Sequence, residues 1–160
     1  MVPCAVITVS DTRSLEDDTG GDLIVEQLAG AGHPVARRVL VTDDVGAIRG
    51  ALQAALAAPA IRTVIVTGGT GVAPRDVTPE AVRPLLEREL PGFGELFRAL
   101  SYKEIGAAAL LSRALAGLCG SKVVFVLPGS RAALRLALEK LILPEIGHLA
   151  GESSKTPRSG

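Results

Sequence analysis

The sequence has few aromatic residues, no net charge and no long apolar run, and each of these absences excludes a class of function. Three phenylalanines and one tyrosine are its only aromatic residues, so a platform for stacking nucleobases is not expected. Seventeen basic and seventeen acidic residues give a formal net charge of zero, which disfavours charge-driven nucleic-acid binding, although a local basic patch would be compatible with it. No run reaches the length of a membrane span, and Arg113 interrupts the most apolar stretch.

Cysteine and asparagine are also scarce. The two cysteines, Cys4 and Cys119, lie in apolar surroundings without CxxC spacing, which favours buried free thiols over a disulfide or a metal site. The start of the chain has no basic segment before an apolar one, so we expect no secretory signal and a cytoplasmic protein. The sequence contains no Asn and prefers Arg over Lys, a bias that suits either a heat-adapted host or a GC-rich genome.

The 160 residues are 48% apolar, which is enough for one globular domain with a substantial core. No internal repeat or long linker divides the chain. We therefore expect a single α/β domain over residues 1–150, followed by a polar, disordered tail over residues 151–160.

The apolar pattern alternates between strands and helices. Four β-branched apolar runs are typical of strands buried in a parallel sheet, namely residues 4–9, 35–41, 61–67 and 122–127. Helical spacing with start and stop signals predicts helices over residues 19–31, 45–58, 78–89, 95–102, 103–118 and 131–140. Such alternation indicates βαβ units and a mostly parallel sheet.

Each of the four predicted strands ends in a short polar or glycine-rich segment. The segments are Ser10-Asp11-Thr12, Thr42-Asp43-Asp44, Thr67 to Gly71, and Pro128-Gly129-Ser130. The carboxyl ends of parallel strands share one edge of the sheet, so these segments are expected to converge on a single site. For Asp43 and Asp44 the alternative, that both simply cap the next helix, stays open at this point.

The glycine-rich segment is followed by an Arg75-Asp76 pair, and the residues of this stretch limit the kinds of ligand that it could bind. Successive glycine N–H groups can bind an anion, although glycine clusters also form ordinary turns. No lysine follows the glycines, and Pro74 stands where the dinucleotide-binding pattern needs a small residue. Backbone amides, hydroxyls and carboxylates remain. They suit an anionic substrate together with Mg²⁺ recruited by aspartates, as in phosphoryl or nucleotidyl transfer.

The stretch Thr67-Gly-Gly-Thr-Gly71, followed by Arg75-Asp76-Val-Thr-Pro-Glu-Ala81, resembles the MoaB/MogA family of molybdenum cofactor biosynthesis. The likeness covers almost the whole chain. It includes Ser10-Asp11-Thr12-Arg13, Asp17-Asp18-Thr19, Pro91-Gly-Phe-Gly-Glu-Leu-Phe-Arg98, Ser101-Tyr-Lys-Glu-Ile-Gly106, Leu111-Ser-Arg-Ala114 and Leu127-Pro-Gly-Ser130. The acidic stretch after Arg13 is more similar to the MoaB branch than to MogA. The resemblance implies a three-layer α/β/α sandwich that binds molybdopterin and forms homotrimers, sometimes hexamers.

The resemblance also implies an activity, namely Mg-ATP-dependent adenylylation of molybdopterin, which releases pyrophosphate and activates the pterin for molybdate insertion. By this likeness Asp43 and Asp76 are the catalytic acids that position Mg²⁺ and ATP, with Asp43 favoured over Asp44. The terminal phosphate of molybdopterin is expected on Gly68, Gly69, Thr70 and Gly71. The remaining substrate-binding residues are expected to be Ser10, Asp11, Thr12, Pro128, Gly129 and Ser130.

One alternative from a different class follows from the same resemblance. Some members of the MoaB branch are thought to lack the transferase role, so a non-catalytic molybdopterin-binding or scaffold protein is the second hypothesis. The presence of both acids, Asp43 and Asp76, favours the enzyme. Either protein is expected to hand the pterin to a molybdenum-insertion partner.

Overall fold

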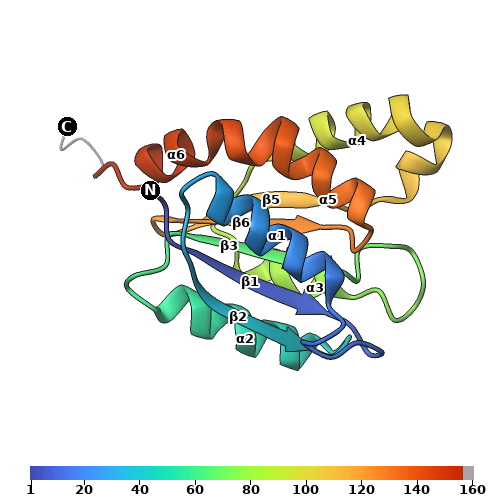
Figure 1. Ribbon diagram of the computed structural model, residues 1–160, viewed down its shortest axis with the longest axis horizontal. Helices are drawn as coiled ribbons and strands as arrows, with labels where there is room; N and C mark the ends of the chain where they lie inside the picture. Colours follow the sequence, from blue (N-terminus) through green and yellow to red (C-terminus); the bar gives the residue numbers. More distant parts are fainter. Residues whose placement is uncertain (157–160) are drawn as a thin grey trace.

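The structure, a computed structural model that describes residues 1–156, has a six-stranded sheet between two layers of helices (Figure 1). The strand order in space is β2-β1-β3-β6-β5-β4. Neighbours among β2, β1, β3 and β6 pair in parallel, whereas β5 and β4 run antiparallel to their neighbours. The strands are β1 (Cys4–Val9), β2 (Val35–Val41), β3 (Thr63–Thr67), β4 (Arg88–Glu89), β5 (Leu115–Cys119) and β6 (Lys122–Leu127).

The helices are divided between the two faces of the sheet. One face packs against α1 (Thr19–Gly30), α4 (Pro91–Ile105), α5 (Arg131–Ala137), the π-helical turn η3 (Leu138–Ile142) and α6 (Leu143–Glu152). The other face packs against α2 (Val45–Ala57) and α3 (Thr78–Val82). Two 3₁₀ turns, η1 (Arg83–Leu85) and η2 (Gly106–Leu111), connect the remaining elements. This arrangement confirms the predicted α/β sandwich with a mostly parallel sheet.

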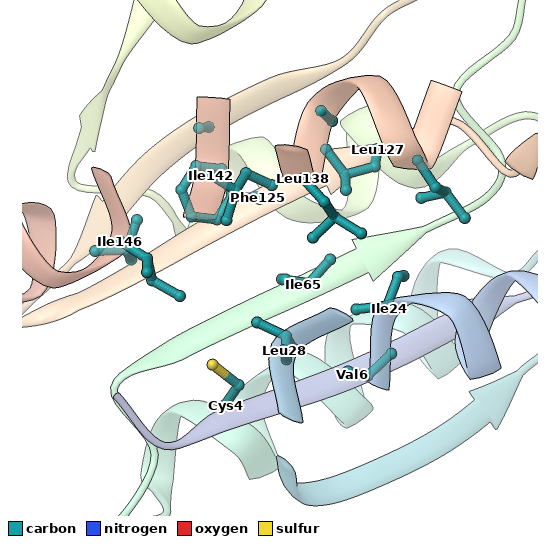
Figure 2. Packing of buried hydrophobic residues seen from close by; sticks show 14 of the residues in the cluster. Cys4, Val6, Ile24, Leu28, Ile65, Phe125, Leu127, Leu138, Ile142 and Ile146 are labelled. Carbon is teal, nitrogen blue, oxygen red and sulfur yellow. The ribbon is translucent and has the colours of Figure 1, made fainter. Parts of the chain in front are cut away.

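The central strands owe their place to side chains that are apolar on both faces. Every residue of β1 and β3 is buried, as expected where helices cover both sides of a parallel sheet. Alternation along β3 sends Ile65 to the α1 and α5 face, and Val64 and Val66 to the α2 face. Figure 2 shows the first of these layers, where Ile65 and Phe125 of the sheet pack near side chains of α1 and of the C-terminal helices.

The prediction of a helix over residues 103–118 was wrong. The helix α4 begins at Pro91 and continues through residues 103–105, and Gly106, which has a φ of 68°, caps its C-terminal end. Residues 115–119 form strand β5, paired with β6 through a tight turn at Gly120. The Ala- and Leu-rich composition favours a helix locally, but pairing with the exposed edge of β6 satisfies the backbone and outweighs that preference.

The predicted helix over residues 78–89 was also too long. The helix α3 ends at Val82, and a 3₁₀ turn that contains Pro84 leads into the two-residue strand β4. Proline lacks the N–H that a continuing helix needs, and its ring clashes with the preceding turn. By contrast, α5, η3 and α6 follow one another without a gap, and Pro144 lies in the first turn of α6, directly after the π-helical turn η3.

The ends of the chain and the cysteines complete the fold. The helix α6 includes Gly151 and Glu152, so the segment expected to be a disordered tail begins within a helix; residues 157–160 lie outside the described residues. Both cysteines are free thiols, as predicted, but only Cys4 is buried and Cys119 is half-buried; burial raises the pKa of the Cys4 thiol to about 12. Across residues 1–156, no helix combines the length and apolarity needed to cross a membrane.

Truncating a core leucine tests this packing. Leu52 of α2 is fully buried against the sheet, so Leu52→Ala should lower the free energy of unfolding by about 2–5 kcal/mol. Leu15 is an exposed leucine in the loop after β1, and Leu15→Ala should change that free energy by less than about 0.5 kcal/mol. Denaturant unfolding of both variants measures the difference, and equal losses would contradict the assigned core.

Candidate functional site

A cavity of about 260 Å³ opens at the edge of the sheet where β1, β2, β3 and β6 end. Its walls come from the segments that follow these strands, as expected for ligand sites in parallel α/β sheets. The lining residues are Thr8, Val9, Ser10, Asp11, Thr12, Arg13, Asp18, Gly20, Asp43, Thr67, Gly68, Gly69, Arg75, Asp76 and Gly129.

Two glycines, Gly68 and Gly69, line this cavity at positions that have no room for a side chain. Gly68 and Gly69 have φ angles of 98° and 68°, in the region that disfavours side chains. A Cβ on Gly68 would collide with the carbonyl oxygen of Val9, and one on Gly69 would collide with the hydroxyl of Thr78. That hydroxyl donates a 2.7 Å hydrogen bond to the Gly68 carbonyl oxygen, which ties the turn to the start of α3.

Some of the predicted binding residues are engaged elsewhere. The Gly68 N–H donates to the Leu127 carbonyl oxygen at 3.0 Å, so it is committed to the sheet rather than to an anion. Thr70 is buried, and the hydroxyl oxygen of Ser130 accepts the Ala133 N–H as the cap of α5. The cavity brings together Ser10, Asp11, Thr12, Asp43, Gly68, Gly69, Asp76 and Gly129 of the predicted set. It is not lined by Thr70, Gly71, Pro128 or Ser130.

Asp43 and Asp44 have separate roles. Asp44 is the N-cap of α2, where its Oδ2 accepts the Ala47 N–H at 2.8 Å. Asp43 lines the cavity, and its own N–H donates to Oδ1 of Asp11 at 2.8 Å. Of the two aspartates after β2, Asp43 is therefore the one placed at the candidate site.

Asp76 reaches the cavity from the loop that precedes α3. Its Oδ2 accepts the Ala73 N–H at 3.0 Å, and its own N–H donates to the Ala73 carbonyl oxygen at 2.9 Å. A Cβ on Gly71 would lie 2.7 Å from Oδ2 of Asp76. Gly71 therefore leaves room for this carboxylate, a reason for glycine at position 71 that differs from anion binding.

Negative charge predominates around Asp43. Burial, followed by repulsion from Asp11 and then Asp76, raises the pKa of Asp43 above its usual value; the charge of Arg75 and a hydrogen bond from the backbone of Asp11 oppose the shift. Within residues 1–156, no three His, Cys, Asp or Glu side chains are grouped so as to hold a metal ion. A cation here would therefore take its remaining oxygen ligands from a substrate, as Mg²⁺ commonly does.

The sequence interpretation assigned no role to Asp18, which is 1% exposed and lines the cavity. Its Oδ2 accepts hydrogen bonds from Thr8 at 2.6 Å and from Arg38 at 3.1 Å, and its Oδ1 accepts the Gly21 N–H. Asp18, rather than the predicted Thr19, is thus the N-cap of α1. The available signal was an acid directly before the helix start.

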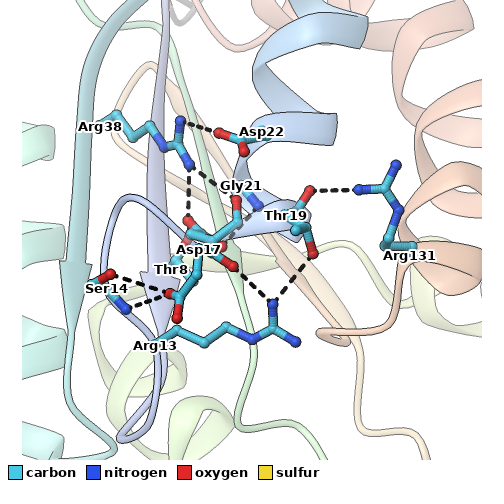
Figure 3. A network of polar contacts seen from close by, with 10 residues as sticks. Thr8, Arg13, Ser14, Asp17, Thr19, Gly21, Asp22, Arg38 and Arg131 are labelled. Carbon is cyan, nitrogen blue, oxygen red and sulfur yellow. Dashed lines mark hydrogen bonds and ion pairs between the residues drawn. The ribbon is translucent and has the colours of Figure 1, made fainter.

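Two arginines were likewise given no binding role. Arg13 lines the cavity and donates from its guanidinium to the Asp17 carbonyl oxygen and the Thr19 hydroxyl (Figure 3). Arg75 lines the cavity as well, and its charge opposes the rise in the pKa of Asp43. The cavity therefore has cationic side chains beside its carboxylates, although no lysine contributes.

Similarity to known proteins identifies the family. The family described as "Probable molybdopterin binding domain" matches residues 5–148. The molybdenum cofactor biosynthesis protein B of Bacillus cereus is 51% identical over 152 residues, which cover 94% of this chain and 90% of that protein. The chain belongs to the MoaB/MogA family of molybdenum cofactor biosynthesis proteins.

Solved structures agree with the MoaB-like branch of this family. A crystal structure of molybdenum cofactor biosynthesis protein B is 49% identical with a TM-score of 0.94, and the match covers 97% of each chain. The structure of the tungsten cofactor synthesizing protein MoaB from Pyrococcus furiosus is 37% identical with a TM-score of 0.88, covering 97% of this chain and 98% of that one. The family and the branch predicted from the motifs are therefore confirmed.

The raised pKa of Asp43 predicts that this residue lowers stability at neutral pH. Burial and nearby carboxylates favour its protonated form in the folded state, so ionisation above the folded-state pKa destabilises the fold. Asp43→Asn should raise the thermal midpoint at about pH 7, and this gain should vanish at about pH 3, where the residue is protonated in both states. Melting curves at the two pH values measure the effect.

Asp44→Asn is the matched control for this prediction. Asn caps a helix about as well as Asp, so this variant should melt close to the wild type at both pH values. A midpoint for Asp43→Asn below that of the wild type at neutral pH would contradict the electrostatic account.

Proposed function

We propose that the protein adenylylates molybdopterin with Mg-ATP, releases pyrophosphate and thereby activates the pterin for molybdate insertion. The observation that carries this proposal is the meeting of Asp43 and Asp76 with the Gly68–Gly69 turn at one cavity. Membership of a family named for molybdopterin binding supports the choice of substrate. The two carboxylates would repel an anionic ligand by themselves, so they fit a substrate that arrives with a divalent cation, as Mg-ATP does.

The reaction would be an in-line displacement at the α-phosphorus of ATP. A phosphate oxygen of molybdopterin forms a bond to that phosphorus while the bond to the β-phosphate bridging oxygen breaks, and pyrophosphate leaves with that electron pair. Such reactions depend mainly on positioning and on neutralising charge. Arg13 and Arg75 supply positive charge at the cavity, and backbone near Gly69 approaches the ligand without a side chain in the way.

The carboxylates fit a divalent cation. Asp43 and Asp76 lie close enough for Asp76 to raise the pKa of Asp43, and such repulsion is relieved when a cation binds between like charges. These two residues would hold Mg²⁺, which supplies charge neutralisation for the phosphates when bound. Thr12, Ser10 and Gly129 are left to contact the pterin or the nucleotide.

The proposal predicts pyrophosphate release only when molybdopterin, ATP and Mg²⁺ are all present. Asp76→Asn keeps the size of the side chain but removes its charge, so turnover should fall by at least about 100-fold while the fold is retained. Asp44→Asn alters an acid that caps α2 outside the cavity, and it should turn over like the wild type. A coupled pyrophosphate assay measures all three proteins.

Two outcomes would count against the proposal. Full activity in Asp76→Asn would remove the assigned role of that residue. Tight molybdopterin binding by the wild type without ATP turnover would instead favour the non-catalytic binding or scaffold role, in which the protein only delivers the pterin to an insertion partner.

We also propose that the chain assembles as a homotrimer, alone or paired into a hexamer. Five exposed apolar side chains lie on the adjoining elements α4 and η2, namely Leu96, Tyr102, Ile105, Leu110 and Leu111. Apolar groups gathered on one part of a surface favour association. This surface is therefore a candidate contact between copies.

Light scattering at micromolar concentration should give three or six times the 16.4 kDa chain mass. Leu110→Asp introduces a charge on the α4 and η2 surface and should lower that mass. Leu15→Asp introduces the same charge in the exposed loop after β1, outside this surface, and should leave the mass unchanged. A monomeric mass for the wild type would contradict the assembly.

A further inference from the structure

Arg113 lies between η2 and β5, about forty residues from the loop that carries Asp76, yet it contacts both ends of that loop. We infer that Arg113 is a positioning residue that fixes Asp76 at the cavity by holding the Thr70–Val77 loop at its start and at its end. The inference rests on the proposed function, because it assigns Arg113 a part in the same reaction.

The contacts of Arg113 span the loop. Its backbone N–H donates to the Thr70 carbonyl oxygen at 3.1 Å, and its Nε donates to the Gly71 carbonyl oxygen at 2.9 Å. Its Nη2 donates to the Asp76 carbonyl oxygen at 2.7 Å, and its Nη1 pairs with Glu80 in the first turn of α3. The last three contacts come from one planar guanidinium, whose donors are held in a rigid fork that a lysine ammonium does not offer.

Thr70 and Val77 are packed at the two ends of the loop, but the residues between them have little other packing to hold them in place. Val72 is 65% exposed, and the residues that follow as far as Arg75 are also exposed. Segments with few buried apolar contacts open at low energy unless hydrogen bonds restrain them. The turn between Ala73 and Asp76 orders the loop internally, but only contacts with the rest of the protein can place that turn relative to Asp43.

Arg113 would act through Asp76 rather than on a ligand. It does not line the cavity that Asp43 and Asp76 share. Its ion pair with Glu80 joins side chains that are 32% and 54% exposed, and such pairs contribute little to stability. The carbonyl contacts at Gly71 and Asp76 are therefore the ones that matter, and losing them frees the carboxylate to move by the ångström or so that costs about 100-fold in rate.

Arg49 provides a matched control. From α2 its Nε donates to the Ala81 carbonyl oxygen at 3.0 Å, and its Nη2 donates to the Glu80 carbonyl oxygen at 3.2 Å. Arg49 therefore makes the same kind of contact, to carbonyl groups of the same helix α3, but these contacts do not include the Thr70–Val77 loop. A purely structural role would give similar results for Arg113→Ala and Arg49→Ala.

The test compares Arg113→Ala, Arg113→Lys and Arg49→Ala in the full chain. With ATP, molybdopterin and Mg²⁺, Arg113→Ala should lower kcat by about 10- to 100-fold with little change in KM. Added guanidinium chloride should restore part of the kcat that Arg113→Ala loses. The kcat of Arg113→Lys should lie between those of Arg113→Ala and the wild type. Arg49→Ala should keep the wild-type kcat and not respond to guanidinium.

Amide hydrogen exchange gives a readout that does not need activity. The Ala73 N–H, which donates to Asp76, should exchange faster in Arg113→Ala and unchanged in Arg49→Ala. The inference would be overturned if Arg113→Ala kept the wild-type exchange rate and kcat. It would also be overturned if Arg113→Ala and Arg49→Ala lost protection and kcat equally. Either result would leave the proposed function intact. If the wild type shows no turnover, the proposed function fails instead, and the exchange comparison alone decides whether Arg113 holds the loop.

Discussion

The close approach of three backbones at the end of β3 is the constraint on which the site depends. Gly68 donates its N–H to Leu127 of β6, and on the opposite side it has no room for a Cβ against the Val9 carbonyl oxygen of β1. Gly69, the next residue, also has a positive φ, of 68°. Because the turn is fixed between two buried strands, the segments after β1, β2 and β6 meet around it with little freedom.

The aspartates at this edge of the sheet do not favour the stability of the fold. Asp11 and Asp76 lie where their charges repel that of Asp43, and Asp43 is partly removed from water as well. A fold selected for stability alone would separate them or pair each with a cation, as Asp18 is paired with Arg38 nearby. Functional sites often retain such unfavourable arrangements, since a cation or substrate relieves them on binding.

The parallel half of the fold could be predicted because its signals are local, whereas the antiparallel half could not. The four β-branched runs all form strands, but β5 consists of Ala- and Leu-rich sequence that becomes a strand only beside the free edge of β6. The site shows the same division. Strand ends predicted that Asp43 would lie beside the glycine-rich turn, and the family resemblance added Asp76, while the hydrogen bonding of Gly68 and the burial of Thr70 depend on tertiary contacts. Arg113 was assigned to a helix, so its link to the Asp76 loop had no local signal.

The central claim is that one cavity at the sheet edge receives both the phosphate of the pterin and the nucleotide. A crystal structure with molybdopterin, a non-hydrolysable ATP analogue and Mg²⁺ tests it most directly. The account predicts phosphate density beside Gly69 and a cation in contact with Asp43 and Asp76, with the surrounding protein unchanged. Ligand density elsewhere on the molecule, with this cavity filled only by water, would contradict it.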